Sequence, residues 1–177
     1  MFSDDLRSDQ SLAGPIRVIL SDVDGVLTDG RVIYDNSGVE TKCFHIRDGL
    51  GIKLWQRAGY QFGIITSRTS EVVRTRAAEL GVRVVRQGVP EKWSAAIEIL
   101  QSLEATPEEV CYIGDDLPDL AVMRRVALPV AVADASEDVR RAARWTTRLP
   151  GGHGAVRELI ERLLKAKSQW EDFVNNP

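Results

Sequence analysis

The chain has 177 residues, of which 44% are hydrophobic and 28% are charged, and its formal net charge is −3 at pH 7. This length and composition are ordinary for a soluble globular protein with one domain that can bury a core. The charge gives no reason to expect a nucleic acid as a partner, no apolar run approaches membrane-spanning length, and residues 1–5 lack the features of a signal peptide, so no membrane association is expected.

The ends of the chain and its two cysteines add little chemistry. Residues 1–14 are expected to form a flexible N-terminal tail, residues 15–165 a single domain, and residues 166–177 a C-terminal tail. Cys43 and Cys111 lie far apart in the sequence and form no metal-binding pattern. We therefore expect two buried or half-buried free thiols and a reducing, cytoplasmic location.

Predicted strands and helices alternate along most of the domain. Residues 16–21 form an apolar, β-branched run that is typical of a buried parallel strand. Two alternating runs around an Asn- and Gly-containing turn then predict a β-hairpin over residues 31–44. The later pattern predicts helices at 48–58, 70–80, 90–103, 117–125 and 155–165, another that begins at Ser136, and strands at 61–65, 82–85, 110–113 and 128–132. This alternation predicts an α/β fold with a doubly wound, Rossmann-like parallel sheet and a small hairpin flap.

One helix carries a specific packing prediction. In the segment 48–58, Leu50, Leu54 and Trp55 are expected to form the apolar stripe that faces the core.

Two carboxylates end the first predicted strand. Asp22 and Asp24 alternate along an extended segment, so they begin on one face, and ligands of open α/β sheets bind at the carboxyl ends of strands. Two acids this close repel each other, and the pKa of one rises unless a cation intervenes. Such a pair suits either a nucleophile beside a general acid/base or a metal site. The alternative is that both residues are turn formers at a strand end.

Further polar residues follow the other predicted strands: Thr66, Ser67 and Arg68 after one, and Asp115, Asp116 and Asp119 after another. Lys92 lies in the first turn of a predicted helix, where the helix dipole disfavours a cation, so we expect it to have an anionic partner. Taken singly, these residues are also typical helix caps or a surface lysine. Gathered at one sheet edge, the carboxylates predict a site for Mg²⁺.

In this order the motifs resemble those of the haloacid dehalogenase superfamily of phosphatases. They are Asp22-Val-Asp24-Gly-Val-Leu-Thr-Asp29-Gly30, Ile-Ile-Thr66-Ser-Arg68, Lys92 and Tyr-Ile-Gly-Asp115-Asp116-Leu-Pro-Asp119. The hairpin and residues 151–158 are similar to those of the 3-deoxy-D-manno-octulosonate 8-phosphate phosphatase family, and the likeness runs from residue 16 to residue 164. That family usually has Gly where Ser67 stands and often Arg where His153 stands.

The resemblance implies a Mg²⁺-dependent phosphatase that forms an aspartyl-phosphate. It makes Asp22 the nucleophile and Asp24 the general acid and then base. The other implied roles are Thr66 and Lys92 on the phosphoryl group, and the Asp22 carboxylate, the Asp24 backbone carbonyl and the Asp115 carboxylate on the metal. Asp116 and Asp119 are expected in an outer shell, with Asp116 orienting Lys92 or a water of the metal. The candidates for binding the substrate are Ser67, Arg68, Arg47 and Arg157. The three arginines are candidates for its carboxylate and phosphate, because Arg recognises both groups.

The implied substrate is a 2-keto-3-deoxy sugar-acid phosphate, 3-deoxy-D-manno-octulosonate 8-phosphate, of lipopolysaccharide biosynthesis. Only about 25 residues separate Thr66 from Lys92, which leaves no room for a separate cap domain. The resemblance implies instead a homotetramer in which hairpins associate and the C-terminal tail reaches a neighbouring site. The main alternative is a phosphatase for a nine-carbon, sialic-acid-like 9-phosphate. Remoter alternatives are a phospho-acceptor module and a non-catalytic assembly domain.

Overall fold

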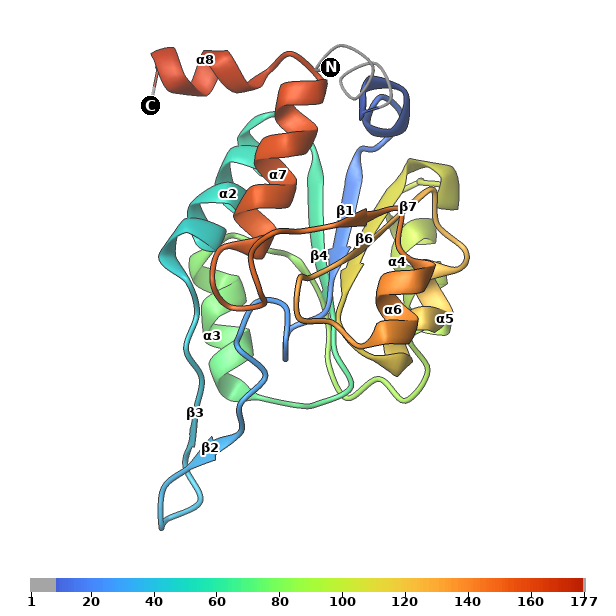
Figure 1. Ribbon diagram of the computed structural model, residues 1–177. Helices are drawn as coiled ribbons and strands as arrows, with labels where there is room; N and C mark the ends of the chain where they lie inside the picture. Colours follow the sequence, from blue (N-terminus) through green and yellow to red (C-terminus); the bar gives the residue numbers. More distant parts are fainter. Residues whose placement is uncertain (1–8, 177) are drawn as a thin grey trace.

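A parallel β-sheet runs through the centre of the computed structural model, which describes residues 9–176 (Figure 1). Within these residues its six strands lie in the order β5 (Val84–Arg86), β4 (Gln61–Ile65), β1 (Val18–Ser21), β6 (Val110–Gly114), β7 (Leu128–Ala131) and β8 (Trp145–Thr146). Each strand is parallel to its neighbours. The chain moves outward from β1 to β5 and then returns to the other side of β1, which is the order of a doubly wound Rossmann-like sheet. The predicted fold class is confirmed.

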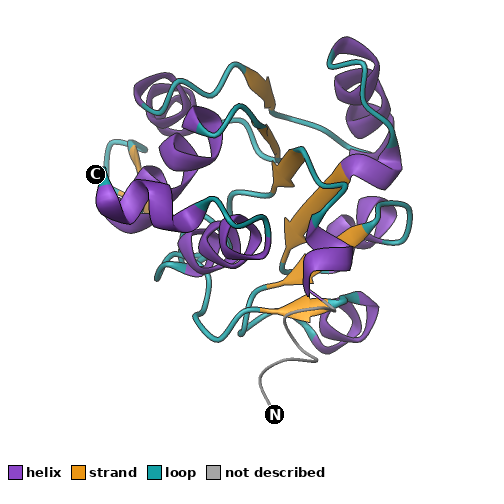
Figure 2. Ribbon diagram, turned by 90° about the horizontal axis from the view of Figure 1, so that it is seen from above, coloured by secondary structure: helices purple, strands orange, loops and turns teal. Residues whose placement is uncertain are grey.

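Helices cover both faces of the sheet (Figures 1 and 2). On one face lie α2 (Ile46–Arg57), α3 (Glu71–Glu79) and α7 (Ala155–Ala166), and on the other lie α4 (Lys92–Ser102), α5 (Leu120–Met123) and α6 (Glu137–Ala142). Further elements outside these two helical layers include the 3₁₀ turns η1 (Pro107–Glu109) and η2 (Leu117–Asp119) and the C-terminal helix α8 (Trp170–Asn175). Because both faces are covered, β1 and β6 are buried along their whole length, as their apolar sequences predict.

The predicted stripe of α2 is wrong at one position. Leu50 is 49% exposed, whereas Ile52, Leu54 and Trp55 are buried. The inner face of α2 is occupied by glycine: a Cβ at Gly51 would lie 3.2 Å from the backbone of α7. Close helix packing through glycine, which a hydrophobic pattern does not register, turns Leu50 outward.

Both predicted tails pack in part against the domain. Residues 1–8 lie outside the described residues, but residues 9–13 are helical and Ala13 is fully buried. Arg162 of α7 donates two hydrogen bonds of 2.7 Å to the Asp9 carboxylate. At the other end, Arg57 lies over the Phe173 ring of α8 at 5.4 Å. In the described part of the chain, no helix combines the length and apolar character that crossing a membrane requires.

The two thiols lie in different surroundings. Cys111 is a free thiol buried in β6, as expected, whereas the free thiol of Cys43 is exposed, so the prediction of burial is wrong for that residue. Cys43 lies between the hairpin strand β3 (Glu40–Thr41) and α2, on the segment that leads from the hairpin back to the domain.

The predicted hairpin extends beyond the carboxyl ends of the sheet (Figure 1). Its strands, β2 (Ile33–Tyr34) and β3 (Glu40–Thr41), are antiparallel and shorter than the predicted runs. Several of its apolar side chains are exposed: Val32, Ile33, Tyr34 and Val39. The chain between Thr66 and Lys92 holds only α3 and β5, so the described residues contain no separate cap domain.

Candidate active site

The site forms where the central strands end. β1 lies between β4 and β6 in parallel register, with Ser21 opposite Ile64 and Ile113. The next residue, Asp22, donates its backbone N–H to the Ile113 carbonyl at 3.1 Å. Parallel strands end at the same edge, so the residues that follow β1, β4 and β6 converge there, as predicted.

Lys92 is buried between two carboxylates at this edge. Its Nζ lies 2.9 Å from Asp22 Oδ1 and 2.7 Å from Asp119 Oδ1, and its side chain is only 3% exposed. Lys92 therefore has two anionic partners, where the sequence predicted that it would have at least one. Burial opposes the positive charge, but the two carboxylates outweigh it and raise the pKa of Lys92. A buried charge persists only when it is paired in this way.

We call the group formed by Asp22, Lys92, Asp115 and Asp119 the carboxylate cluster. Asp119 is fully buried and organises this cluster. Besides Lys92, its Oδ1 accepts a hydrogen bond from the Tyr112 hydroxyl at 2.6 Å. Its Oδ2 accepts from the backbone N–H of Asp115 at 2.9 Å and of Asp116 at 3.2 Å. Burial and the nearby carboxylates raise the pKa of Tyr112, so its hydroxyl stays protonated as a donor. Both oxygens of Asp119 are thus occupied in holding Lys92 and the loop after β6.

The remaining carboxylates fit a divalent cation. Oxygens of Asp22, Asp115 and Asp119 lie within 4.8 Å of one another. Among the described residues, Asp22 Oδ1 and Asp115 Oδ1 are buried without a hydrogen bond of good geometry, although the Lys92 ammonium lies close to the former. Because Asp119 is otherwise occupied, Asp22 and Asp115 are the acids free to hold a metal. An all-oxygen donor set suits Mg²⁺.

Gly25 lets the turn after Asp24 lie close to Asp115. Gly25 has φ of +91°, and a Cβ there would lie 2.1 Å from Asp115 Oδ2. Burial, followed by the charge of Asp119, raises the pKa of Asp22 to about 6 and that of Asp115 to about 8. Carboxyl groups that hold their protons this strongly are short of positive charge, which is what a cation would supply.

A second ionic cluster reaches Asp24 from the hairpin. The Lys42 ammonium donates to Asp24 Oδ1 and lies 3.4 Å from Glu40 Oε1. Glu40 also accepts hydrogen bonds from Arg68 Nη2 at 2.7 Å and from the Ser70 hydroxyl. The bond from Ser70 is the main cause of a lowered pKa at Glu40.

Sequence reasoning missed Lys42, Glu40 and Tyr112. Alternation in the extended run after the hairpin turn puts residues 40 and 42 on one face, an acid beside a base, and this was the available signal. Tyr112 sits in an apolar strand, where a hydroxyl needs a partner when buried.

The predicted substrate-binding residues are dispersed. Ser67 and Arg47 are exposed, whereas Arg68 is half-buried and hydrogen-bonded to the hairpin through Glu40 and Tyr34. The Arg157 guanidinium lies 4.9 Å from the Trp170 ring, away from the carboxylate cluster.

The two other predicted polar residues lie beside the cluster. Thr66 is buried directly after β4. The side chain of Asp116 is exposed, and Lys92 is contacted by Asp119 instead. The loop geometry explains this, because both residues follow β6 but only Asp119 turns back under the sheet edge.

The loop that contains Gly151 and Gly152 packs against the turn that follows Asp24. Gly152 donates its N–H to the Val26 carbonyl at 2.9 Å, and Gly151 donates to Asp134 Oδ1 at 2.9 Å. A Cβ at Gly151 would lie 1.8 Å from the Gly25 carbonyl oxygen. Two stretches of backbone therefore touch here, and no side chain fits between them.

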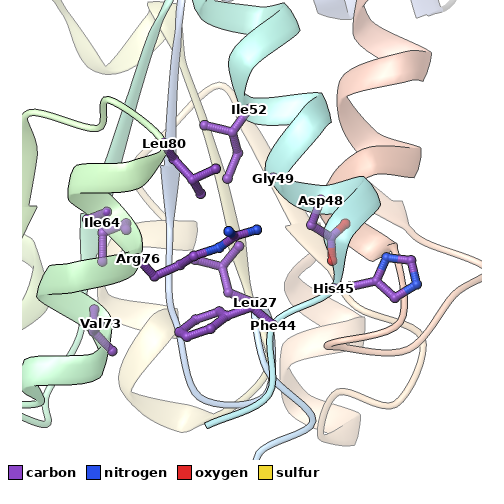
Figure 3. Close-up of a pocket in the computed structure, with 11 residues that line it drawn as sticks. Leu27, Phe44, His45, Asp48, Gly49, Ile52, Ile64, Val73, Arg76 and Leu80 are labelled. Atoms are coloured by element: carbon purple, nitrogen blue, oxygen red, sulfur yellow. The ribbon is translucent and has the colours of Figure 1, made fainter.

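A separate hollow of about 320 Å³, including the part open to solvent, lies between α2 and α3 (Figure 3). Its lining is mostly apolar, and Arg76 lies 5.9 Å from the Phe44 ring across it. Asp22, Asp24 and Asp115 do not line it. The chemistry therefore belongs to the sheet edge and not to this hollow.

Comparison with known proteins agrees with this geometry. Residues 81–159 match the family model of haloacid dehalogenase-like hydrolases. The 3-deoxy-D-manno-octulosonate 8-phosphate phosphatase of Yersinia pestis is 43% identical over 159 residues, which cover 90% of this chain and 85% of that protein. The chain belongs to the 3-deoxy-D-manno-octulosonate 8-phosphate phosphatase family. The predicted resemblance is confirmed.

Solved structures of this phosphatase family have the same fold. The crystal structure of the Yersinia pestis phosphatase matches with a TM-score of 0.90 at 42% identity, covering 92% of this chain and 88% of that one. The phosphatase of Moraxella catarrhalis, crystallised with a magnesium ion, a phosphate ion and a KDO molecule, matches with a TM-score of 0.93 at 37% identity. That match covers 96% of this chain and 97% of the other.

Proposed function

We propose that this protein is a Mg²⁺-dependent phosphatase that hydrolyses 3-deoxy-D-manno-octulosonate 8-phosphate in lipopolysaccharide biosynthesis. The observation that carries the proposal is the buried Asp22–Lys92 pair beside an unpartnered oxygen of Asp115. The relative from Yersinia pestis is named for this activity, and the Moraxella catarrhalis structure holds a magnesium ion, a phosphate ion and a KDO molecule together.

In the first half of the proposed reaction, an oxygen of Asp22 attacks phosphorus and the bond between phosphorus and the sugar oxygen breaks. Asp24 gives its proton to that sugar oxygen, which leaves as a hydroxyl group. Lys92 offsets charge on the transferring group, and the Thr66 hydroxyl donates to a phosphoryl oxygen. Asp119 Oδ1 accepts a hydrogen bond from Lys92 Nζ at 2.7 Å, which keeps Lys92 beside the nucleophile.

In the second half, a water molecule gives a proton to Asp24 and its oxygen bonds to phosphorus. The bond from phosphorus to Asp22 breaks, which releases phosphate and restores both carboxyl groups. Asp22, Asp115 and the Asp24 backbone carbonyl would hold Mg²⁺, which offsets the charges of the nucleophile and the phosphate.

We further propose that the active form is a cytoplasmic homotetramer in which neighbouring subunits complete the substrate site. Four exposed apolar residues on the hairpin support self-association through that element. Ser67 and Arg68 follow Thr66 at the end of β4, and we assign them to the sugar acid. Arg47 and Arg157 have no contact with the cluster of their own chain, so we assign them to a neighbour's site, which the C-terminal tail also reaches.

The test is steady-state phosphate release from the eight-carbon 8-phosphate and the nine-carbon 9-phosphate, each with Mg²⁺ and with a chelator. We expect Mg²⁺-dependent turnover with a clear preference for the eight-carbon substrate. Preference for the nine-carbon substrate would overturn the substrate assignment and leave the mechanism intact. Absence of turnover on both would favour an assembly or phospho-acceptor role.

A further inference from the structure

Lys42 is a buried cation that the mechanism above does not use. It lies on the extended segment after β3, at the root of the hairpin, and its side chain is only 1% exposed. Its ammonium group donates to Asp24 Oδ1 and lies 3.4 Å from Glu40 Oε1. A lysine is almost never buried this far unless it is paired, and here two carboxylates pair it.

Within residues 9–176, Lys42 is the one side chain that bonds to the Asp24 carboxylate. The Asp24 side chain is 20% exposed, and Asp24 lies in the turn that follows β1, between Val23 and the positive-φ Gly25. A carboxyl group on such a turn can rotate, whereas proton transfer requires it within hydrogen-bond reach of the sugar oxygen. The contact with Lys42 removes that freedom.

We propose that Lys42 is a positioning residue that holds the Asp24 carboxyl group in place for proton transfer, and that Glu40 holds Lys42. The proposal rests on the acid/base role of Asp24 in the proposed function. The contact uses one carboxylate oxygen, and the second is the one we assign to the proton. One oxygen can accept from Lys42 whether or not the other carries a proton, so the contact serves both halves of the reaction.

The same contacts connect the hairpin to the loop between β4 and α3, which begins at Thr66. Glu40 accepts from Arg68 and Ser70, which lie on the loop between β4 and α3, while Lys42 reaches the loop after β1. The hairpin therefore ties the acid/base to the loop that carries Thr66. A positioning role also explains why the lysine is buried, since a solvated lysine at this point would leave Asp24 free to turn.

The test compares two substrates in single-turnover reactions with enzyme in excess. The sugar phosphate has a poor leaving group that needs a proton, whereas p-nitrophenyl phosphate releases a phenolate that does not. General acid catalysis is worth about 10²–10⁴-fold, so Lys42→Met should slow cleavage of the sugar phosphate by about 10–100-fold. Cleavage of p-nitrophenyl phosphate should slow by less than about threefold.

Lys53→Met is the matched control, because Lys53 is an exposed lysine on α2, and it should leave both rates unchanged. Glu40→Gln keeps Lys42 but weakens its second contact, so it should show the same selective loss to a smaller degree. If Lys42→Met does not fold, as judged by circular dichroism, Glu40→Gln decides. An equal loss on both substrates, or no loss on either, would overturn the positioning role.

Failure of the proposed function has a different signature. In that case the wild-type protein itself would not cleave the sugar phosphate. Alternatively, labelled phosphate from the substrate would not be found bound covalently to Asp22 after the reaction is stopped with acid. Active wild-type enzyme with an unchanged substrate ratio in both variants contradicts only the role of Lys42.

Discussion

Asp22 and Lys92 owe their proposed chemistry to burial. Each is an ordinary surface residue type, yet here Asp22 is 8% exposed and Lys92 is 3% exposed. Inside the protein the attraction between them is stronger than in water. Lys92 therefore keeps its charge and lies where a phosphoryl group bound to Asp22 would need it.

Asp22→Asn tests the nucleophile. The amide occupies the same space but is a much weaker nucleophile, so turnover should fall by at least about a thousandfold. Phosphate release from the eight-carbon substrate measures this effect. Asp138→Asn is the control, because Asp138 is an exposed acid on α6 with no assigned role in the site. Full activity in Asp22→Asn would exclude covalent catalysis by this residue.

The carboxylate cluster predicts how Mg²⁺ stabilisation depends on pH. Folding raises the pKa of Asp22 from 3.8 to about 6 and that of Asp115 from 3.8 to about 8. The folded state therefore binds these protons more tightly than the unfolded state. Without metal, their contribution to stability is full below the unfolded pKa and is lost as the pH rises through the folded values.

Mg²⁺ competes with those protons, so it should raise the melting temperature more at about pH 8.5 than at about pH 5. Saturation at a hundred times the dissociation constant contributes about 2.7 kcal/mol, or roughly 5–10 °C for a domain of this size. Thermal unfolding with Mg²⁺ and with a chelator at both pH values measures it. Asp115→Asn should lose most of the difference, and equal shifts at the two pH values would contradict the prediction.

Among the secondary-structure elements, those with strong local signals follow the sequence closely. β4 spans residues 61–65 as predicted, and α3, predicted over residues 70–80, lies between its N-cap Ser70 and the positive-φ Gly81. β8 was not predicted, because two residues at a sheet edge carry no periodicity. The predicted helix at 117–125 begins as the 3₁₀ turn η2, which contains Pro118. These differences arise where packing outweighs local preference.

Two glycines with the same φ angle allow the cost of backbone strain to be distinguished from the cost of a steric clash. Gly152 and Gly81 both have φ of +69°, but a Cβ at Gly152 would lie 2.5 Å from the backbone at Asp29, whereas at Gly81 nothing lies within 4 Å. Gly81→Ala should cost only the left-handed strain, roughly 1–2 kcal/mol, and keep its activity. Gly152→Ala should in addition displace the turn after Asp24 and lower kcat by more than about tenfold. Urea unfolding and phosphate release measure both, and equal behaviour of the two variants would contradict the bracing role.

At the scale of the whole molecule, the hairpin is the exposed apolar feature that most needs a partner. Ile33 is 42% exposed and Tyr34 is 57% exposed on strands of two residues each, which cannot be stable alone. Ile33→Lys should convert the proposed tetramer into smaller species, as measured by light scattering after size-exclusion chromatography. Gln101→Lys, which adds the same charge at an exposed residue of α4, outside the hairpin and the C-terminal tail, is the control and should leave the mass unchanged. A monomeric wild-type protein would contradict the assembly.

The sequence by itself determined the fold class, the family and the convergence of Asp22, Asp24, Thr66 and Asp115 on one sheet edge. These follow from periodicity and from motif order, which are properties of neighbouring residues. Only the tertiary structure decided that Asp119 holds Lys92, that Leu50 faces outward, and that Lys42 reaches Asp24 from the hairpin. The physical reason is that such contacts join residues far apart in the chain, and the burial that makes a charge choose its partner exists only once the layers have packed.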